Sequence, residues 1–297
     1  MIKWEEQTLR SLLFAPGNHK HRLEKVGTFG ADGIVLDLED AVPESEKNDA
    51  RELVLGALHT YNKTPVVCVR VNSHETGRME EDIIKIVHPE LNAIMVPKIE
   101  SADTLKRCDA LLYALERERN LQTGSIKLIG LIETPIGLIQ CDDVATQSPP
   151  RTIALGFGLG DFSTAMQLDL TVEGDELLYA RSRLLTASRA AGLRAPIDGP
   201  FLDIPNKEGL LKNTKRSKAL GFEGRGAIHP DQVDIVQKIY SDVSEEDARR
   251  SELIVEAFEK AIDTGSASIQ VEGQFVDGPI YERALQKVRL FRSKNTN

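Results

Sequence analysis

The chain has 297 residues, of which 41% are hydrophobic and 28% are charged, and its formal net charge is −9. This acidic balance argues against a nucleic-acid partner, which usually requires a basic face. It does not exclude an anionic small-molecule ligand, because local basic residues and a metal can reverse the field at a site. No run approaches the ~18 apolar residues of a membrane-spanning helix, so no membrane partner is expected.

Short apolar runs alternate with longer amphipathic segments along most of the chain. The predicted strands are Ser11–Ala15, Gly33–Leu38, Pro65–Val71, Ala93–Lys98, Ile126–Ile132, Thr152–Gly156, Ala195–Leu202 and Gly224–Ile228. The predicted helices between and after them are Lys20–Phe29, Glu44–His59, Glu80–Val87, Ala102–Arg119, Gly137–Thr146, Asp175–Ala191, Lys207–Leu220 and Asp231–Ile239. Continuous Val-, Ile- and Leu-rich runs such as GIVLDL are typical of parallel strands covered on both faces. Eight strand–helix repeats predict an α/β fold, a (β/α)₈ TIM barrel over residues 1–240.

An open, doubly wound sheet is the alternative, and it would often show a GxGxxG turn after its first strand. The first turn here is APGNHK, which lacks that pattern. GFGLGD at 156–161 contains G-x-G-x-G, but it follows the sixth strand, and no helix is predicted to begin directly after it. The closed barrel is therefore preferred.

The pattern changes after residue 240. Glu245–Ile262 is predicted as a helix with Ser244 as its N-cap, and the strand-like SIQVEGQFVD precedes a last helix, Tyr281–Phe291. We expect residues 241–297 to form a helical C-terminal extension outside the barrel.

The three cysteines, Cys68, Cys108 and Cys141, show no CxxC spacing, so neither a disulfide framework nor a zinc site is indicated. Cys68 lies in an apolar run and is interpreted as a small core residue. Acidic residues stand near the start, where a secretory signal peptide would need a basic and then an apolar segment. These observations favour a cytoplasmic protein.

Active sites of such barrels lie at the C-terminal ends of the strands. Polar residues and glycines predicted at those ends are Asp37, Glu39, Asp40, Arg70, Asn72, Lys98, Glu133, Gly158, Gly160, Asp161, Asp198, Asp203 and His229. Many of them follow an apolar run directly, so we expect them to converge on one mouth.

Glu133 and Asp161 follow neighbouring strands of this predicted barrel. Two carboxylates at one mouth repel each other unless a cation lies between them or one is protonated. Oxygen ligation by few protein groups is typical of Mg²⁺. The alternative is that backbone N–H groups or salt bridges satisfy each carboxylate separately.

Arg70 ends the apolar strand VVCVRVN, where a desolvated guanidinium needs a partner. It could bind a substrate carboxylate or enolate oxygen, or form an ion pair with Glu39 or Asp40, and the two roles are compatible. The glycines of GFGLGD could offer backbone N–H groups to an anion or form a tight turn. HKHR at 19–22 could meet phosphates or be a solvated basic face, and His229 is interpreted as a core or capping histidine.

The strand-end residues lie in sequence motifs that resemble those of one family. RSLLFAPGN, GADGIVLDLEDAVPESEK, VRVNS, VPKIES, IGLIETPIG, GLGDFS, IDGPFLDI and GRGAIHPDQV are similar, in this order, to the citrate lyase β-subunit-like (CitE-like) branch of the HpcH/HpaI aldolase superfamily. The resemblance extends from about residue 10 to residue 236. It implies a barrel with a helical C-terminal extension, assembled as a homotrimer.

The resemblance also implies roles for particular residues. Glu133 and Asp161 would ligate Mg²⁺, and Arg70 would contact the oxo-acid part of the substrate, with Glu133 bordering the same pocket. Glu39 and Asp40, in LDLEDAV, would surround the metal and hold its waters.

Two further residues receive roles in the same way. Gly160 and its neighbours would place backbone N–H groups on the oxo-acid carboxylate. VEGQFVDGPIYERAL at 271–285 is similar to the C-terminal motif of the malyl-CoA and citramalyl-CoA lyase branch. There an aspartate, Asp277 here, is the acid/base for the acetyl-CoA methyl group and belongs to a lid from the neighbouring subunit. From the local sequence alone, Asp-Gly-Pro ahead of a helix would instead be a helix cap.

The activity implied is a Mg²⁺-dependent carbon–carbon lyase. It would cleave a 3-hydroxyacyl-CoA of the malyl-CoA, citramalyl-CoA or citryl-CoA type into acetyl-CoA and a 2-oxo acid. One alternative is a citrate lyase β subunit that acts on a citryl thioester of an acyl-carrier protein within a complex. The other is a CoA-independent class II pyruvate aldolase, a branch that this chain resembles less in LDLEDAV.

Overall fold

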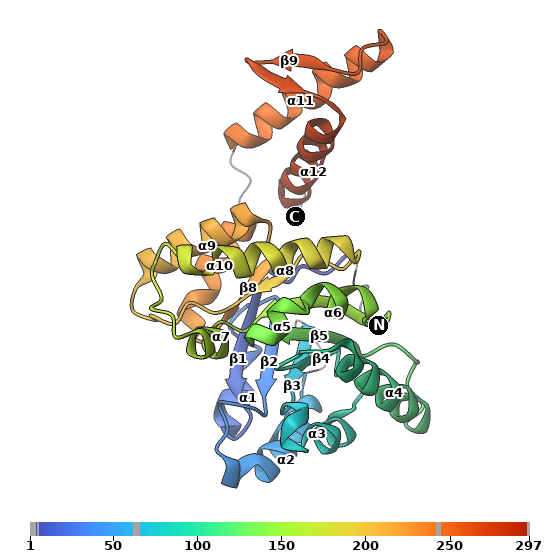
Figure 1. Ribbon diagram of the computed structural model, residues 1–297, viewed down its shortest axis with the longest axis vertical. Helices are drawn as coiled ribbons and strands as arrows, with labels where there is room; N and C mark the ends of the chain where they lie inside the picture. The colour runs from blue at the N-terminus through green and yellow to red at the C-terminus, as the bar shows by residue number, and fades with distance from the viewer. Residues whose placement is uncertain (1–3, 5, 62–65, 242–244, 296–297) are drawn as a thin grey trace. The chain divides into compact units, whose positions relative to one another are not determined.

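The computed structural model describes residue 4 and residues 6–61, 66–241 and 245–295. The chain divides into two compact units, Met1–Tyr240 and Ser241–Asn297. In the first unit eight parallel strands pair in chain order, and β8 closes on β1 (Figure 1). Their bounds are β1 Ser11–Pro16, β2 Gly33–Asp37, β3 Val66–Arg70, β4 Ala93–Val96, β5 Lys127–Ile132, β6 Thr152–Phe157, β7 Ile197–Asp198 and β8 Gly224–Ala227. The predicted (β/α)₈ barrel and its eight strands are confirmed.

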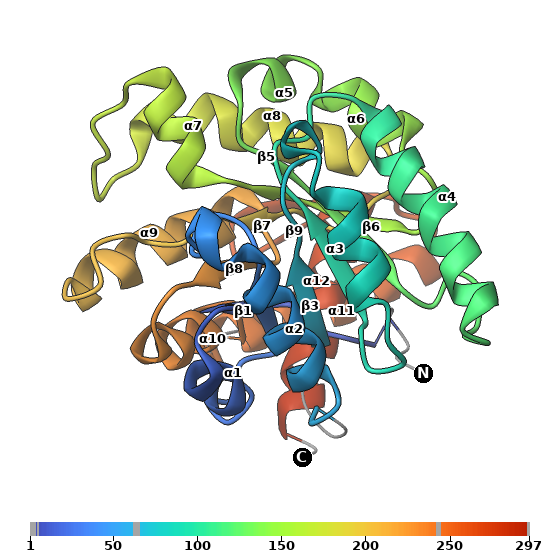
Figure 2. The same ribbon diagram turned by 90° about the horizontal axis from the view of Figure 1, so that it is seen from below.

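Helices follow the strands and surround the barrel, as Figure 2 shows from below. They are α1 Lys20–Val26, α2 Lys47–Leu58, α3 Met79–Ile86, α4 Ala102–Glu118, α5 Pro135–Ile139, α6 Cys141–Gln147, α7 Leu159–Met166, α8 Leu178–Ala190, α9 Lys207–Leu220 and α10 Val233–Ser241. Single 3₁₀ turns are η1 Glu44–Glu46, η2 His74–Thr76, η3 Asp175–Leu177 and η4 Pro230–Gln232. The helix predicted over Gly137–Thr146 is two helices, α5 and α6, which divide at Gln140.

The structure corrects the prediction made for GFGLGD. Helix α7 begins at Leu159 directly after β6, with Gly158 as its N-cap. Asp161 therefore lies in the first turn of a helix, where a carboxylate is favoured by the helix dipole. The strand predicted over Ala195–Leu202 is only Ile197–Asp198, because Gly199 packs against Leu159 and Pro200 has no N–H to donate to a ladder.

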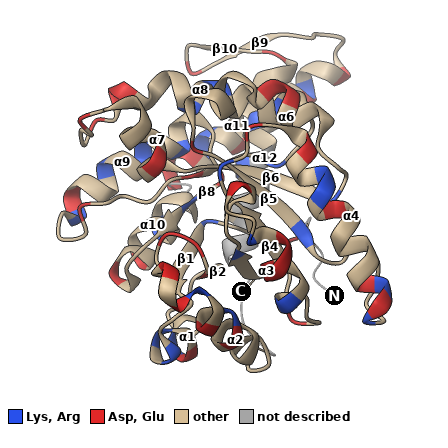
Figure 3. Cartoon of the chain, turned by 60° about the horizontal axis from the view of Figure 1, so that its bottom comes forward, with Lys and Arg blue, Asp and Glu red and all other residues tan. Residues whose placement is uncertain are grey.

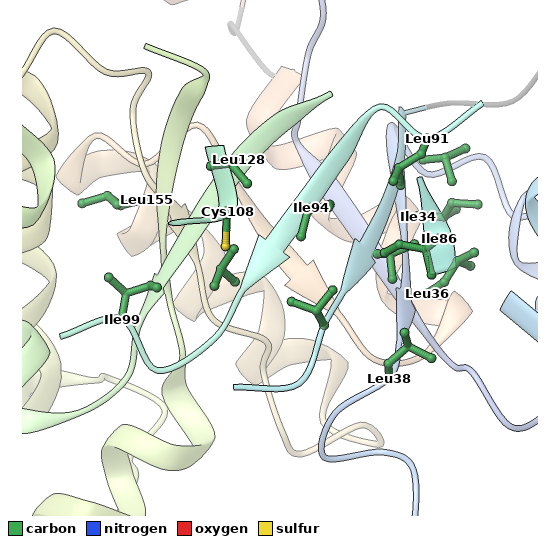
Figure 4. Packing of buried hydrophobic residues seen from close by; sticks show 14 of the residues in the cluster. Ile34, Leu36, Leu38, Ile86, Leu91, Ile94, Ile99, Cys108, Leu128 and Leu155 are labelled. Atoms are coloured by element: carbon green, nitrogen blue, oxygen red, sulfur yellow. The ribbon is translucent and has the colours of Figure 1, made fainter. Parts of the chain in front are cut away.

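Alternate residues of each strand face opposite sides of the barrel wall. Ile34 and Leu36 of β2 pack outward in the large cluster between strands and helices, part of which Figure 4 shows. Val35 belongs to a separate cluster inside the barrel. Cys68 of β3 lies in that inner cluster and is fully buried, as predicted for a core residue. This period of two continues to the strand ends and decides which polar side chains enter the mouth.

Basic and acidic residues are interspersed along outer helices such as α1, α4 and α9 (Figure 3). Among the described residues, none of the helices combines the length and apolarity that a membrane crossing requires.

The second unit contains two helices and a hairpin. They are α11 Glu245–Asp263, β9 Ile269–Val271, β10 Gln274–Val276 and α12 Gly278–Asn295. The hairpin turns at Glu272 and Gly273, both with positive φ, the backbone of a two-residue type I′ turn. Ile254, Phe258, Val276 and Ala284 form a small core of its own. The predicted N-cap Ser244 lies outside the described residues.

Candidate active site

Three strand ends direct charged side chains into the barrel mouth. Each lies two residues beyond a member of the inner cluster and therefore faces the same side of the wall: Asp37 follows Val35, Arg70 follows Cys68, and Glu133 follows Leu131. Their placement therefore follows from strand alternation. Both Asp37 and Glu133 are buried.

Arg70 is held by carboxylates at the mouth. Its Nε and Nη2 donate to the two oxygens of Asp37 at 2.7 and 2.6 Å, and Nη1 lies 3.1 Å from Glu39 Oε2 and 3.5 Å from Asp40 Oδ2. The predicted ion pairs with Glu39 and Asp40 are thus present, but the bidentate partner is Asp37, which was placed at the mouth without a role. Burial raises the pKa of Asp37, but the charge and hydrogen bonds of Arg70 outweigh it and lower that pKa.

Lys98 is the second cation of the mouth, and sequence reasoning gave it no role beyond its strand-end position. Its Nζ donates to Glu39 Oε1 at 2.7 Å and lies 3.0 Å from Asp161 Oδ2 and 3.5 Å from Asp40 Oδ1. Its backbone N–H donates to Glu133 Oε1 at 2.7 Å. The signal that could have found it was a lysine two residues beyond a buried strand, in VPKIES.

Carboxylates outnumber cations at this mouth. Oxygens of Glu39, Asp40 and Asp161 lie within 4.8 Å of one another, and Glu133 is beside this group. Burial, followed by the charge of Glu39, raises the pKa of Glu133 to about 8. Burial likewise raises the pKa of Glu39 to about 7. Burial therefore outweighs the positive charge of Arg70, which lowers both pKa values.

Two atoms of the cluster are consistent with a divalent cation. Glu39 Oε2 and Asp161 Oδ2 are buried, and in the described part of the chain they accept no well-aligned hydrogen bond, although Arg70 Nη1 and Lys98 Nζ lie 3.1 and 3.0 Å from them. An all-oxygen donor set with excess negative charge is the chemistry that Mg²⁺ prefers. The side chains present therefore fit a magnesium ion.

The glycines after β6 have different functions. A Cβ on Gly158 would lie 2.0 Å from Glu133 Oε2, so this position requires glycine if Glu133 is to stay in place. A Cβ on Gly160 would meet nothing within 4 Å, so it faces open space. Gly160 lies in the first turn of α7, where backbone N–H groups have no partner within the helix. An anion can therefore approach the backbone there.

A cavity of about 160 Å³ opens at this mouth. Polar and charged residues on its wall include Asp40, Arg70, Glu133 and Asp161, and the wall also contains Leu12, Phe14, Met95, Leu131, Gly158, Gly160 and Ile197. The volume is close to that of a cavity which binds benzene, so it can hold only a few carbon atoms. The cavity thus combines an acidic cluster, one arginine and an apolar wall.

A second cavity, of about 490 Å³, shares Phe14 and Ile228 with the first. Helix α1 lines it with His21, Arg22 and Lys25. These side chains come from HKHR and the next turn, so the motif borders a cavity and is not only a solvated face.

The side chains of three other predicted strand-end residues, Asn72, Asp198 and His229, pair with groups outside the acidic cluster. Asn72 donates to Asp82 of α3 at 2.7 Å, and Asp198 pairs with Arg181 of α8 at 3.0 Å. His229 accepts from the N–H of Asp231 at 3.2 Å and caps η4, as expected of a capping histidine. These side chains stabilise the barrel wall and its loops.

Asp277 lies in the second unit, at the start of α12. Its Oδ1 accepts from the Ile280 N–H at 3.3 Å, and its carbonyl accepts from Tyr281 N–H at 2.9 Å. The capping role considered from the sequence is present. The cap uses only one carboxylate oxygen of Asp277, so it is compatible with a catalytic role for the other. That role stays a prediction.

Comparison with known proteins gives one consistent result. A model of the HpcH/HpaI aldolase/citrate lyase family matches residues 10–230. Citrate lyase subunit beta of Leuconostoc mesenteroides subsp. cremoris is 34% identical over 96% of this chain and 94% of its own. Mitochondrial citramalyl-CoA lyase of Homo sapiens is 30% identical over 96% and 86%. CitE from Mycobacterium tuberculosis, in complex with magnesium, acetoacetate and coenzyme A, superimposes with a TM-score of 0.75 at 27% identity, over 95% of this chain and 98% of that one.

Proposed function

The chain belongs to the HpcH/HpaI aldolase/citrate lyase family, and on that premise we propose that it is a Mg²⁺-dependent carbon–carbon lyase acting on a 3-hydroxyacyl-CoA. The products are acetyl-CoA and a 2-oxo acid. The observation that carries the proposal is the small cavity in which Arg70, Glu133 and Asp161 converge. The magnesium, acetoacetate and coenzyme A bound by CitE from Mycobacterium tuberculosis support the metal and both substrate classes.

Glu133 and Asp161 are the proposed ligands of Mg²⁺, with Glu39 and Asp40 holding its waters. Support comes from the group of carboxylate oxygens of Glu39, Asp40 and Asp161, with Glu133 beside them, which outnumber the two cations of the mouth, Arg70 and Lys98. When bound, Mg²⁺ supplies Lewis-acid polarisation and a template for the oxo acid. The protein's own part is to hold the carboxylates in place before the metal binds.

Arg70 and Gly160 orient the oxo acid in this proposal. The Arg70 guanidinium stabilises negative charge that develops on substrate oxygens as the carbon–carbon bond breaks. It is already oriented by Asp37, so little side-chain ordering is needed at that moment. Backbone N–H groups near Gly160 receive the oxo-acid carboxylate.

Coenzyme A extends beyond the small cavity, because about 160 Å³ admits only the reacting end of the substrate. The second cavity is adjacent and presents Arg22 and Lys25. We place the phosphates of the thioester against these two side chains, since guanidinium and ammonium groups are the usual protein partners of phosphate.

Asp277 is the proposed acid/base. In cleavage the 3-hydroxyl group releases its proton to solvent as it becomes the keto group of the oxo acid, and Asp277 donates a proton to the carbon of the leaving enolate. In synthesis Asp277 removes a proton from the methyl group of acetyl-CoA, and the new hydroxyl group takes a proton from solvent. We propose that it reaches the site as part of a lid, residues 241–297, supplied by the neighbouring subunit of a homotrimer.

The test is a coupled assay of malyl-CoA, citramalyl-CoA and citryl-CoA, with Mg²⁺ and with excess chelator. We expect turnover of at least one thioester, and only with the metal. Glu133→Ala and Asp161→Ala should remove activity and Mg²⁺ binding together, whereas Asp103→Ala, an exposed surface carboxylate, should keep both. Full activity in the chelator would refute the proposal.

A second candidate is the β subunit of a citrate lyase complex, because citrate lyase beta subunits are 32–34% identical over nearly the whole chain. It predicts copurification with partner subunits and turnover of a citryl thioester on an acyl-carrier protein. Activity on free CoA esters by the isolated chain would decide against it.

A further inference from the structure

Lys98 contacts the whole acidic cluster, through both its side chain and its backbone. Its ammonium donates to Glu39, lies 3.0 Å from Asp161 Oδ2 and 3.5 Å from Asp40 Oδ1. These three residues are the ones whose oxygens lie within 4.8 Å of one another. The ammonium therefore lies where the carboxylates of the site are concentrated.

The backbone of Lys98 holds the fourth carboxylate independently of the side chain. Lys98 has a φ of +52°, unusual for a residue with a Cβ. In this conformation its N–H donates to Glu133 Oε1 at 2.7 Å. Losing the ammonium would leave this contact in place.

We propose that Lys98 is a built-in counter-ion for the metal site. Its ammonium donates to Glu39 and neutralises Asp40 and Asp161 in the metal-free protein, and it leaves Asp161 when Mg²⁺ binds, while its N–H keeps Glu133 oriented. The inference rests on the proposed function, because it takes Asp161 as a magnesium ligand.

Two observations support displacement of the ammonium. Asp161 Oδ2 is buried with Nζ 3.0 Å away, so a metal cannot reach this oxygen until the ammonium moves. The Lys98 side chain is 27% exposed, and a flexible four-carbon chain can carry its charge into solvent. Without a counter-ion, the metal-free carboxylates would repel one another.

The test is the Mg²⁺ affinity of Lys98→Met, measured by calorimetry on the full-length protein. Removing a competing positive charge a few ångströms from the metal should tighten binding, on the order of tenfold. The metal-free variant should also melt at a lower temperature than the wild type. Lys106→Met is the matched control, because Lys106 pairs only with Asp103 on the surface among the described residues, and its affinity should not change.

Unchanged or weaker Mg²⁺ binding by Lys98→Met would overturn the counter-ion role and indicate that the ammonium only organises the site. Should the variant not fold, crystals of the wild type with and without Mg²⁺ decide the question. Loss of the Nζ–Asp161 contact on metal binding supports the proposal, and its retention overturns it. A wild type that binds no Mg²⁺ refutes the proposed function itself.

Discussion

Close neighbours surround both oxygens of the Glu133 carboxylate. Lys98 N–H donates to one of its oxygens at 2.7 Å, and Gly158 leaves room for the other, which a Cβ would approach to 2.0 Å. Burial raises its pKa to about 8. At the residue scale, the orientation of Glu133 depends on neighbours that contact both of its oxygens.

Gly158→Ala should therefore abolish Mg²⁺ binding and activity, because the new methyl group displaces Glu133. Overpacking of this kind also lowers the free energy of unfolding by roughly 1–3 kcal/mol. Calorimetry and chemical denaturation measure the two effects. Gly56→Ala is the control: its Cβ meets nothing within 4 Å in helix α2, so it should raise stability by roughly 0.5–1 kcal/mol. Wild-type metal affinity in Gly158→Ala would contradict the assignment.

The metal-free protein should lose stability as the pH rises from about 5 to about 8. Glu133 and Glu39, with pKa values raised to about 8 and about 7, keep protons in the folded state that the unfolded chain releases near 4.5. The unfolded state then binds fewer protons, so the free energy of unfolding falls with rising pH, on the order of 1 kcal/mol per pH unit.

Urea denaturation in the presence of a chelator measures this slope. Glu133→Gln, which cannot titrate, should show a shallower fall. A flat or rising profile in the wild type over this range would show that the two carboxylates are ionised in the metal-free protein.

Asp277→Asn should retain Mg²⁺ and oxo-acid binding but lose turnover by about 10²–10⁴-fold, the usual contribution of a positioned acid or base. Asparagine still caps helices, so the structure of α12 should be preserved. Steady-state kinetics beside calorimetry separates binding from turnover. An unchanged kcat would remove Asp277 from the mechanism.

At the scale of elements, hydrogen bonds within the short loops after the strands hold the site residues in position. Asp37 accepts from the N–H groups of Glu39 and Ala41 at 2.9 and 3.1 Å, and buried Lys47 donates to the carbonyls of Leu38 and Glu39 at 2.9 and 2.6 Å. The loop after β2 is thus fixed by its own chain. Thr134 does the same after β5, where its side chain caps α5 and binds Glu100 at 2.7 Å.

Thr134→Ala should lower the free energy of unfolding by about 1 kcal/mol, because the Gly137 N–H at the start of α5 loses its acceptor. Chemical denaturation measures the change. The matched control is Thr146→Ala, where an exposed hydroxyl donates to the carbonyl of Asp142 within helix α6 and a change within about 0.5 kcal/mol is expected. Equal effects at both sites would contradict a special role for the cap.

At the scale of the whole molecule, barrel closure brings together residues far apart in sequence. Asp37 and Arg70 come from adjacent strands, and Lys98, Glu133 and Asp161 follow the next three. The second unit has its own core and carries Asp277. We propose that Asp277 acts in the site of a neighbouring subunit of a homotrimer.

Mixed oligomers test that proposal. Asp277→Asn and Glu133→Gln should each be inactive alone. If the lid comes from a neighbouring subunit, coexpression restores activity, since some sites then combine an intact Glu133 with an intact Asp277. Native mass spectrometry verifies that mixed oligomers form. Their formation without recovered activity would mean that both residues act from one subunit.

Much of this arrangement could be predicted from the sequence. The apolar runs located all eight strands, and the polar residues after them located Arg70, Glu133 and Asp161 at one mouth. Helix α7 was missed because glycine-rich GFGLGD has low helix propensity. Its start packs closely against Glu133 and against Gly199, which are distant in the sequence. The ion-pair partner of Arg70 could not be predicted from the sequence, because three acidic residues were candidates. Its distance to each of them depends on loop conformation.

The sequence by itself determined the barrel, its strand order and the family, because strand alternation and strand-end position are properties of the chain alone. Only the tertiary structure decided that Asp37 is the bidentate partner of Arg70, that Lys98 contacts the acidic cluster and that Gly158 must lack a side chain. Each of these depends on distances between different strand ends, which are set when the closed barrel packs. The negative charge of the site could be predicted from the sequence, whereas the role of Lys98 as its counter-ion could not.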